Sequence, residues 1–565
     1  MVKRILGFFY QETNTLNQAA LLLGFFTFLS QVLAFLRDRL LAHIFGAGLE
    51  LDIYYAAFRI PDFIFVTAAS VVSLSVLIPF IIEKDGESRE KLREFVDGVF
   101  SFFGVLILVA SILAWVLMPF VTGLLFKGFS PEVLAQVMGI SRLLLLSPII
   151  LGFSNLFGSL TQAYNRFTIY ALAPLLYNAG IILGIVFLAE EMGIRGVAIG
   201  VILGALLHAL VQVPFVVKAG LFPRLRLGFG GQARPFDWNL VLRVIKISLP
   251  RTLTLAMSSI TLLFLTSFAS LMSAGSISVL TFSINLQSVP LTLIGISYSL
   301  AAFPTLTRRF QEKNLVAFVD QMVLTTRFII FWSLPLTALL IVLRAQVVRV
   351  VLGTGMFNWD DTRLTAAALA LFVLSSVFQS LLLLFMRGFY SAGYTRKPFV
   401  INLFSTIFLF ATAYGLVKLF YASEIFPYFV SVLLKVEDIP NTVVLMLPLA
   451  FTLGTILNVI ILWVSFEREF KGFSRQVMRT LFQTFGVSVI MGAAAYAALN
   501  YLEPAFHNER LLGLFFQGFT AGIFAIVVGV MTFIALDNKE VSDIWQVLKS
   551  KFWKTKVIAT DPEIV

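Results

Sequence analysis

The sequence predicts an all-α membrane protein whose fourteen transmembrane helices form two parallel six-helix lobes followed by two C-terminal helices. Three features support this prediction: the composition is strongly apolar, long apolar runs recur along the chain, and basic residues mark alternate gaps between the runs. Hydrophobic residues make up 59% of the 565 residues, mean hydropathy is +0.93, and only 13% of residues are charged. A soluble globular protein carries about 25% charged residues, so we expect a polytopic membrane protein.

Each apolar run has the length of a membrane-spanning helix, because crossing the hydrocarbon core takes about 20 apolar residues. In chain order, we expect helices at about 16–45, 52–82, 94–126, 134–164, 167–190, 193–219, 241–272, 276–305, 316–352, 362–393, 398–422, 441–466, 476–502 and 510–536. Several ranges hold roughly 30 residues, more than one bilayer thickness requires, so we expect tilted or interrupted helices. After Asp537 we expect a short amphipathic helix at the inner membrane surface.

Basic residues are distributed unevenly between the two sets of predicted loops. One set, taken at alternate gaps, holds most of the lysines and arginines, whereas the opposite set holds only Lys127, Arg195, Arg363, Lys435 and Arg510. Lysine and arginine are enriched in cytoplasmic loops, so both termini are predicted to be cytoplasmic, in a bacterial plasma (inner) membrane. The formal net charge of +11 then reflects topology, and we expect no nucleic-acid partner.

An internal repeat supports the two-lobe arrangement. At offsets of 224 to 227 residues, Gly48 recurs as Gly275, Pro79 as Pro304, Tyr164 as Tyr390 and Asn178 as Asn402. Six helices return the chain to the same side of the membrane, so the halves are expected to be parallel repeats, between which transporters commonly place their substrate. The expected divisions are an N-lobe at 1–218, a cytoplasmic linker at 219–240, a C-lobe at 241–470, a C-terminal helix pair at 471–536 and a cytoplasmic tail at 537–565.

The sequence shows no motif of an enzyme or of a metal site. Cysteine is absent, which excludes disulfides and thiolate chemistry, and the three histidines, His43, His208 and His507, are far apart. We find no paired carboxylates, catalytic triad, phosphate-binding loop or metal-ligand spacing. We therefore expect no enzymatic activity and no bound cofactor or metal.

Charged residues concentrate in the first two predicted helices, between residues 31 and 79. A charge near the bilayer centre costs roughly 2.5–3.5 kcal/mol on insertion scales, so such groups usually face a polar cavity or a partner. Neighbouring helical residues point about 100° apart, so we expect Arg37 and Asp38 to diverge and at least one of them to find a partner on another helix. Two interpretations remain open: a buried ion network that fixes helix packing, and an anion site, because the planar fork of arginine suits phosphate.

Further polar residues are candidates for the same site. Asp52 is expected to cap the second helix, and Arg59 either pairs with Asp52 or Asp62 or contacts the substrate. Arg251, directly after Pro250, is either a charge at the membrane interface or a second cation facing Arg37. Asn285 is a neutral polar group in an apolar run, where such groups usually bridge helices or line a cavity.

The runs around Arg37-Asp38, IFGAG, Asp52 and FRIPD resemble the MurJ (MviN) family, as does the run from Ser267 to Leu306. The resemblance covers about residues 16–536 and implies fourteen helices, a central cationic cavity, and a groove for a lipid tail formed by helices thirteen and fourteen. It also implies that the substrate is lipid II, the undecaprenyl-pyrophosphate-linked peptidoglycan precursor. The family belongs to the superfamily that includes multidrug and toxic-compound extruders.

On this resemblance, Arg37 matches a cavity arginine of the family, and Asp38 and Asp52 match family aspartates. The chain departs from the family pattern at several positions where well-known members carry charges, here occupied by Gln31, Phe65, Ser70 and Asn285. Thr406 also stands at an acidic position of the family's sodium site. We therefore assign no coupling ion, and the membrane potential or an unidentified ion is expected to drive transport.

The expected function is flipping of lipid II, or of a similar polyprenyl-pyrophosphate-linked saccharide, to the outer leaflet by alternating access. The expected substrate-binding residues are Arg37, Asp38, Asp52, Arg59, Arg251 and Asn285. Membrane lipids are expected partners, with the cell-wall synthesis machinery as a further candidate. Two alternatives remain: an exporter of another lipid-linked oligosaccharide or drug in the same superfamily, and a non-transporting cell-wall scaffold.

Overall fold

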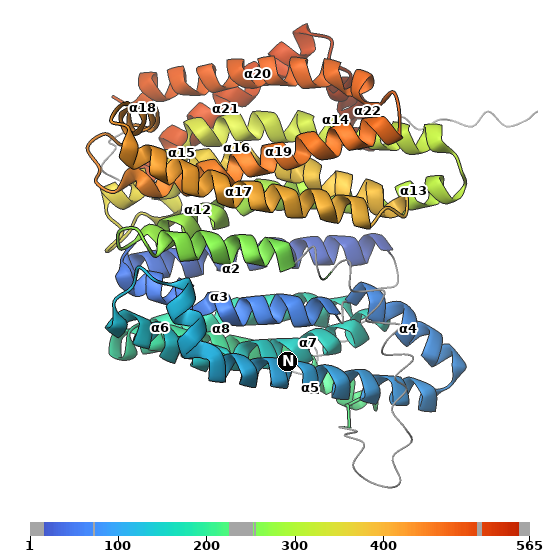
Figure 1. Cartoon of the computed structure of the whole chain (residues 1–565). Helices are drawn as coiled ribbons and strands as arrows, with labels where there is room; N and C mark the ends of the chain where they lie inside the picture. Colours follow the sequence, from blue (N-terminus) through green and yellow to red (C-terminus); the bar gives the residue numbers. More distant parts are fainter. Residues whose placement is uncertain (1–15, 72–73, 225–251, 253–255, 505–510, 553–565) are drawn as a thin grey trace, which may run out of the picture. The chain divides into compact units, whose positions relative to one another are not determined.

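The computed structural model describes residues 16–71, 74–224, 252, 256–504 and 511–552, and within these residues every regular element is helical (Figure 1). The all-α fold class is therefore confirmed. The chain divides into two compact units, each described below by itself. Unit 1 comprises Met1–Phe282, Val351–Thr365 and Asn402–Ala450, and unit 2 comprises Ser283–Val350, Ala366–Ile401 and Phe451–Val565. The lobe, linker and tail boundaries named above stay predictions.

Unit 1 contains the first helices of the chain. They are α2 (Leu16–Phe45), α3 (Leu49–Val71), α4 (Leu74–Glu87), α5 (Arg89–Leu125), α6 (Pro131–Leu144), α7 (Leu146–Ala163), α8 (Phe167–Met192), α9 (Ile194–Leu210) and α10 (Val213–Lys218). A helix over Ala256–Ala269 follows. The unit also holds α18 (Ile425–Leu434) and the short 3₁₀ helix η2 (Thr442–Leu445).

Unit 2 is built around the later helices. Its elements are the π-helical segment η1 (Leu291–Ile296), α13 (Ser297–Gln311), α14 (Leu315–Val342), α20 (Phe473–Leu502), α21 (Leu511–Ala535) and α22 (Lys539–Phe552). Five helices begin in one unit and end in the other: α12 (Ser276–Pro290), α15 (Arg344–Leu352), α16 (Trp359–Ser391), α17 (Arg396–Ala422) and α19 (Met446–Glu469).

In the described residues, eleven helical segments are long and apolar enough to cross a membrane. The other predicted spans correspond to α2, to α3 with α4, and to Ala256–Ala269. Arg59 and Asp62 interrupt the apolar run of α3, whereas the charges of α2 lie toward its end, at residues 37–39. The count of fourteen spans is consistent with this structure. The chain is a multi-pass membrane protein.

Several long predicted helices are interrupted, as expected from their length. The range 134–164 is divided at Leu145 between α6 and α7, and 316–352 is divided at Leu343 between α14 and α15. In the range 276–305, the π-helical segment η1 follows Pro290 directly. Proline lacks an amide hydrogen and its ring clashes with the carbonyl one turn earlier, and such disturbed turns are a known cause of wider helical turns and kinks.

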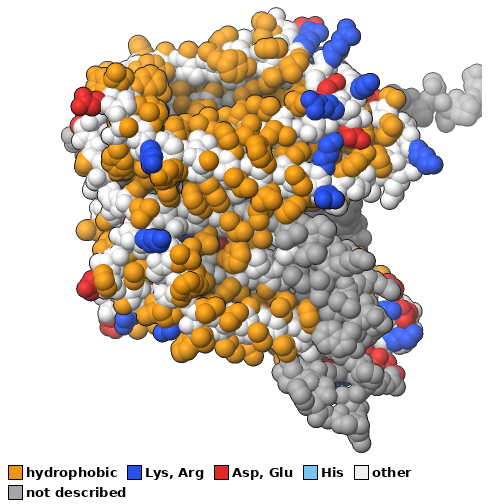
Figure 2. Space-filling model, viewed as in Figure 1, with side chains coloured by type: hydrophobic (Ala, Val, Ile, Leu, Met, Phe, Trp, Pro, Cys, Tyr) orange, Lys and Arg blue, Asp and Glu red, His pale blue; other side chains and the backbone are white. Residues whose placement is uncertain are grey.

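The outer surface of the helices is apolar, as lipid requires. On α5, Leu113 is 56% exposed, Val116 58% and Phe120 70%. On the face shown in Figure 2, hydrophobic side chains cover the lengths of the helices, and charged side chains gather toward helix ends. Exposed apolar patches of this size mark interaction surfaces, and a lipid bilayer is the partner that a multi-pass protein presents them to.

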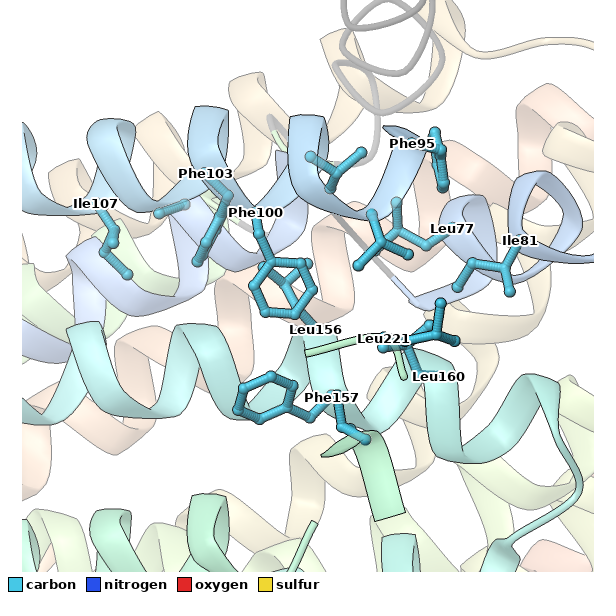
Figure 3. Close-up of a cluster of buried hydrophobic side chains, with 14 of the residues drawn as sticks. Leu77, Ile81, Phe95, Phe100, Phe103, Ile107, Leu156, Phe157, Leu160 and Leu221 are labelled. Atoms are coloured by element: carbon cyan, nitrogen blue, oxygen red, sulfur yellow. The ribbon is translucent and has the colours of Figure 1, made fainter. Parts of the chain in front are cut away.

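The core of unit 1 lies between α4, α5 and α7. Phe100 and Phe103 of α5 and Leu156 and Phe157 of α7 are buried in it, together with Leu77 of α4 (Figure 3). The rings of Phe100 and Phe157 lie 5.3 Å apart between centroids, a separation typical of favourable aromatic pairs. This cluster holds α4, α5 and α7 together, and α3 packs against α5 and α7.

Helices α8 and α9 pack closely through glycines. A Cβ atom added to Gly184 would lie 2.4 Å from the Cα of Gly200, and one added to Gly180 would lie 2.3 Å from the Cα of Gly204. No side chain fits at these positions unless the two backbones move apart. Small residues at such spacing allow close helix approach in membranes, where van der Waals packing replaces the hydrophobic driving force.

Gly184→Ala is expected to destabilise the protein, because the added methyl group overlaps the backbone of α9. Overpacking of this kind typically costs about 1–3 kcal/mol. The apparent melting temperature of the purified protein in detergent measures the effect. Gly139→Ala in α6 is the matched control, because nothing lies within 4 Å of its added Cβ, so this variant should melt at or above the wild-type temperature. Equal melting temperatures of Gly184→Ala and Gly139→Ala would contradict the close packing of α8 on α9.

The C-terminal helix α22 is anchored to unit 2 by a buried ion pair. The Oε1 atom of Glu540 accepts hydrogen bonds from the Nε of Arg327 on α14 at 2.6 Å and from the Oγ1 of Thr480 on α20 at 2.8 Å. Glu540 is only 2% exposed. Val541 and Ile544 pack on the same side against the cluster that contains Phe331 and Phe533. The expected tail helix is thus confirmed as a helix, and its position at the inner membrane surface stays a prediction.

Glu540→Ala is expected to release α22, because Arg327 then loses its buried partner. Breaking a buried pair by removing one member costs about 3–5 kcal/mol. Limited trypsin digestion should therefore cut the tail at least several-fold faster than in the wild-type protein. Asp543→Ala, an exposed acid on the same helix, is the control and should be cut at the wild-type rate. The anchor is refuted when both variants are cut equally fast.

Candidate functional site

The candidate site is built on α2, α3 and α8 of unit 1. On α2, Val32 and Leu36 are exposed, whereas Asp38, Leu41 and Ala42 are buried. Val32 and Leu36 thus lie on the outer face of α2, and Asp38 lies on its buried face. The Arg37 side chain retains 22% exposure and that of Asp38 only 4%, so part of the arginine side chain stays accessible.

Arg37 forms three hydrogen bonds. Its Nε and one terminal nitrogen both donate to the Oδ1 of Asp38, at 3.0 and 2.8 Å, and the other terminal nitrogen donates to the Oδ1 of Asn178 on α8 at 3.1 Å. The expectation that Arg37 and Asp38 diverge is wrong, because the long arginine side chain folds back onto its neighbour. The expectation of a partner on another helix is confirmed by Asn178.

Two N–H groups of Arg37 remain available in the described residues. A guanidinium carries five N–H donors in a fixed fork, and the three hydrogen bonds above use one on each nitrogen. One remaining donor lies on each of the two terminal nitrogens, and guanidinium donors of this kind bind phosphate and carboxylate oxygens. Asp38 and Asn178 hold the fork in place. Arg37 thus combines a fixed orientation with free bonding capacity.

Tyrosines surround this arginine. Tyr54 and Tyr55 on α3 and Tyr177 on α8 all lie near enough to Arg37 for electrostatic interaction. The hydroxyl of Tyr55 is buried and has no hydrogen-bond partner among the described residues. A buried hydroxyl without a hydrogen-bond partner costs free energy.

Sequence reasoning missed the tyrosines and Asn178 as site residues. In the sequence Asn178 marks the internal repeat, and in the structure its side-chain amide also donates to the Oγ of Ser30 on α2 at 3.3 Å. Two pairs of polar residues in otherwise apolar runs could have indicated these site residues: Tyr54-Tyr55 and Tyr177-Asn178. Polar residues inside membrane helices usually bridge helices or line polar space.

Arg59 on α3 binds hydroxyl groups. Its Nε donates to the Oγ1 of Thr266 at 2.8 Å and a terminal nitrogen donates to the Oγ1 of Thr281 on α12 at 3.3 Å. Of the two acids considered as partners of Arg59, Asp52 has its carboxylate bonded to the start of α12 instead. Asp62, one turn further along α3, interacts with Arg59 electrostatically. Neutral hydroxyl partners leave the positive charge of Arg59 less compensated than an ion pair would.

Asp52 caps a different helix from the one expected. Its carboxylate accepts hydrogen bonds from the backbone N–H of Gly275 at 2.7 Å, from the backbone N–H of Ser278 at 2.7 Å and from the Ser278 hydroxyl at 2.6 Å. These are the free amides at the start of α12. Asp52 lies inside the first turn of α3 and so cannot take the preceding position from which a side chain caps its own helix. Its role in substrate binding stays a prediction.

The structure brings together some of the predicted site residues. Arg37 and Asp38 are in contact, and Tyr55 interacts electrostatically with both of them and with Arg59. Arg251 lies outside the described residues. Asn285 is half-buried on α12 in unit 2, where its backbone carbonyl accepts from the Ser288 hydroxyl at 2.7 Å. Unit 1 thus holds Arg37 and Arg59, the buried acids Asp38 and Asp52, and three tyrosines near Arg37.

A family model described as "Lipid II flippase MurJ" matches residues 41–517. This range covers most of the chain. The chain belongs to the MurJ family of lipid II flippases. The resemblance noted in the sequence is therefore confirmed. The match begins at Leu41, so Arg37 and Asp38 lie just before it, whereas Asp52, Arg59 and Asn178 lie within it.

The MurJ assignment agrees with individual relatives. A probable lipid II flippase MurJ from Haemophilus influenzae is 28% identical over 399 residues, covering 67% of this chain and 77% of the relative. The solved structure titled "Lipid II flippase MurJ, inward closed conformation" aligns with a TM-score of 0.71 at 20% identity, covering 92% of this chain and all of the other. An inward-facing multidrug transporter of the MOP superfamily aligns with a TM-score of 0.60 at 18% identity. These structural likenesses show a shared fold.

Proposed function

We propose that this protein translocates lipid II from the inner to the outer leaflet of the bacterial plasma membrane by alternating access. Membership of the MurJ family supports the substrate. The proposed membrane orientation places both termini in the cytoplasm, as the charge distribution of the loops predicts. The protein acts as a transporter, and the proposal includes no covalent step on the substrate.

The observation that carries the proposal is the arginine fork on α2. Arg37 is oriented by Asp38 and Asn178, partly exposed, and keeps two N–H donors available for the oxygens of a diphosphate. Arginine pairs bidentately with phosphate oxygens and stays charged. The hydroxyls of Tyr54, Tyr55 and Tyr177 supply further hydrogen-bonding groups nearby.

In the proposed cycle, the diphosphate binds at Arg37 from the cytoplasmic side and the two lobes rock to release the headgroup outside. The polyprenyl tail stays in lipid, with α20 and α21 as the proposed groove. Moving one charge through the membrane field is worth about 2.3 kcal/mol per 100 mV, so the membrane potential is a sufficient energy source. A coupling ion remains unassigned, and we propose the cell-wall synthesis machinery as a functional partner.

Complementation tests the proposal most directly. Expression of this chain in bacteria depleted of their own lipid II flippase is expected to restore growth and cell shape. In proteoliposomes, fluorescent lipid II should cross the bilayer at least tenfold faster than in empty liposomes, whereas labelled phosphatidylethanolamine should not. A protein that inserts in the membrane but neither restores growth nor flips lipid II would overturn the proposal, and the scaffold alternative would then be preferred.

A further inference from the structure

The short helix α18 presents a continuous apolar stripe to the outside. It begins after a two-residue break that follows α17. Five of its ten side chains are large, apolar and strongly exposed: Ile425 81%, Tyr428 68%, Phe429 60%, Val432 41% and Leu433 63%. Their spacing of three, four, seven and eight residues from the first puts them on one helix face. We call these five residues the α18 stripe.

The opposite face of α18 is held against the protein. Val430, Ser431 and Leu434 are buried, and the helix packs on η2. It ends at Lys435, which adopts the left-handed conformation. The backbone carbonyl of Lys435 accepts a hydrogen bond from Arg363 at 2.7 Å. The α18 stripe is therefore presented in a fixed orientation.

The loop after α18 is fastened by an ion pair. Both terminal nitrogens of Arg363 donate to the carboxylate of Asp438, each at 2.6 Å. The hydrogen bonds from Arg363 hold the pKa of the Asp438 carboxyl below its usual range, so this pair is charged at neutral pH. Bidentate arginine–carboxylate pairs add geometric specificity as well as energy. The hydrogen bonds of Arg363 to Asp438 and Lys435 hold the C-terminal end of α18 close to the start of α16.

The α18 helix is not a membrane span. Ten residues of α-helix extend about 15 Å, roughly half of the 30 Å thickness of the hydrocarbon core. Figure 1 shows α18 seen nearly along its axis, whereas α17 runs across the view. α18 therefore crosses the direction of α17 and does not prolong it.

The apolar surface of α17 leads directly to the α18 stripe. Toward its end, α17 exposes Tyr414 at 53%, Leu419 at 45% and Tyr421 at 73%. The ammonium group of Lys418 lies 4.7 Å from the ring centre of Tyr414, as expected of a lysine that reaches from apolar surroundings toward water. Tyrosines are enriched at membrane–water interfaces. Exposed Glu424 and Lys435 flank the α18 stripe, so the polar ends bracket an apolar centre.

We propose that α18 is an interfacial anchor, with the α18 stripe inserted into the acyl boundary of the bilayer beside the end of α17. The partner is a lipid surface. The predicted topology places this surface in the outer leaflet. The proposal concerns how the chain sits in the membrane and does not depend on which substrate is transported. An apolar helix face lying in the interface plane is the general mode of such anchoring.

Cysteine labelling tests the anchor cleanly, because the chain contains no native cysteine. The full-length variants Phe429→Cys and Leu433→Cys carry an environment-sensitive fluorophore on the α18 stripe, and Glu437→Cys carries it on the exposed loop as the matched control. Each labelled protein is reconstituted in phosphatidylcholine/phosphatidylglycerol vesicles, with and without lipids brominated near the headgroup. Iodide reports access from water. Gel filtration and circular dichroism select variants that remain folded, and either stripe variant alone suffices.

At 429 and 433 we expect brominated lipids to quench at least half of the fluorescence and iodide to quench little. At 437 we expect the reverse. Similar quenching at 429 and 433 would further support a helix lying in the membrane plane. Quenching by iodide and not by brominated lipid at the stripe positions would overturn the proposal, and the α18 stripe would then be assigned to a protein partner.

Discussion

Replacing Arg37 with alanine is expected to abolish transport of lipid II while the protein still inserts in the membrane. The substitution removes the two N–H donors available to the diphosphate. Hydrogen bonds to charged groups contribute about 1.5–3 kcal/mol each, so losing two of them should slow transport about 100-fold or more. The rate of fluorescent lipid II flipping in proteoliposomes measures the loss, at equal protein content.

The alternative interpretation, an ion pair that only fixes helix packing, predicts a different pattern. Removing Arg37 leaves the buried carboxylate of Asp38 without its cation, at a cost of about 3–5 kcal/mol. The double variant Arg37→Ala/Asp38→Asn removes both charges and should recover the wild-type melting temperature. Transport should stay lost in this variant if Arg37 binds substrate. Recovery of transport together with stability would show that Arg37 acts only in packing.

Two further variants sharpen this test. Arg37→Lys keeps the charge but loses the planar fork, so we expect partial transport, because a single ammonium cannot bind two phosphate oxygens bidentately. Arg142→Ala is the matched control for removing an arginine from a membrane helix. Arg142 stacks on the ring of Trp115 at 4.5 Å and donates to the backbone carbonyl of Trp115. Its loss should leave transport within about twofold of wild type, since surface substitutions away from a site change little.

Asp52→Ala is expected to cause a large loss of stability, because Asp52 joins α3 to the start of α12. Without the carboxylate, the backbone N–H groups of Gly275 and Ser278 lose their partners. A buried donor left unsatisfied costs about 1–3 kcal/mol, so the total should be about 2–6 kcal/mol. The apparent melting temperature in detergent and the yield of monodisperse protein both measure it.

Glu50→Ala is the control for Asp52→Ala. Glu50 lies in the same first turn of α3 and carries the same charge, but its side chain is exposed. Both substitutions therefore remove a negative charge near the helix N-terminus. The interaction of such a charge with the helix dipole is worth only about 0.3–1 kcal/mol. Asp52→Asn should fall between the two, because one oxygen still accepts a hydrogen bond. Equal melting of Asp52→Ala and Glu50→Ala would refute the capping role.

The helices were largely predictable because their signals are local. The first predicted span, 16–45, coincides with α2, and the expected interruptions appear at Leu145 and Leu343. Length and hydropathy of each segment decide whether it enters the membrane, and a nearby lysine or arginine biases its orientation. Neither signal requires knowledge of any other segment. Local pattern alone did not single out α18.

Sequence by itself determined that this chain is a multi-pass helical membrane protein of the MurJ family with charges concentrated in its first two helices. Tertiary structure alone decided which partners those charges take: Asn178 for Arg37, the amides of α12 for Asp52, and two threonines for Arg59. These partners lie 141 to 226 residues apart along the chain. A side-chain hydrogen bond requires a donor and acceptor within about 3 Å, and only the packing of whole helices brings such distant residues that close.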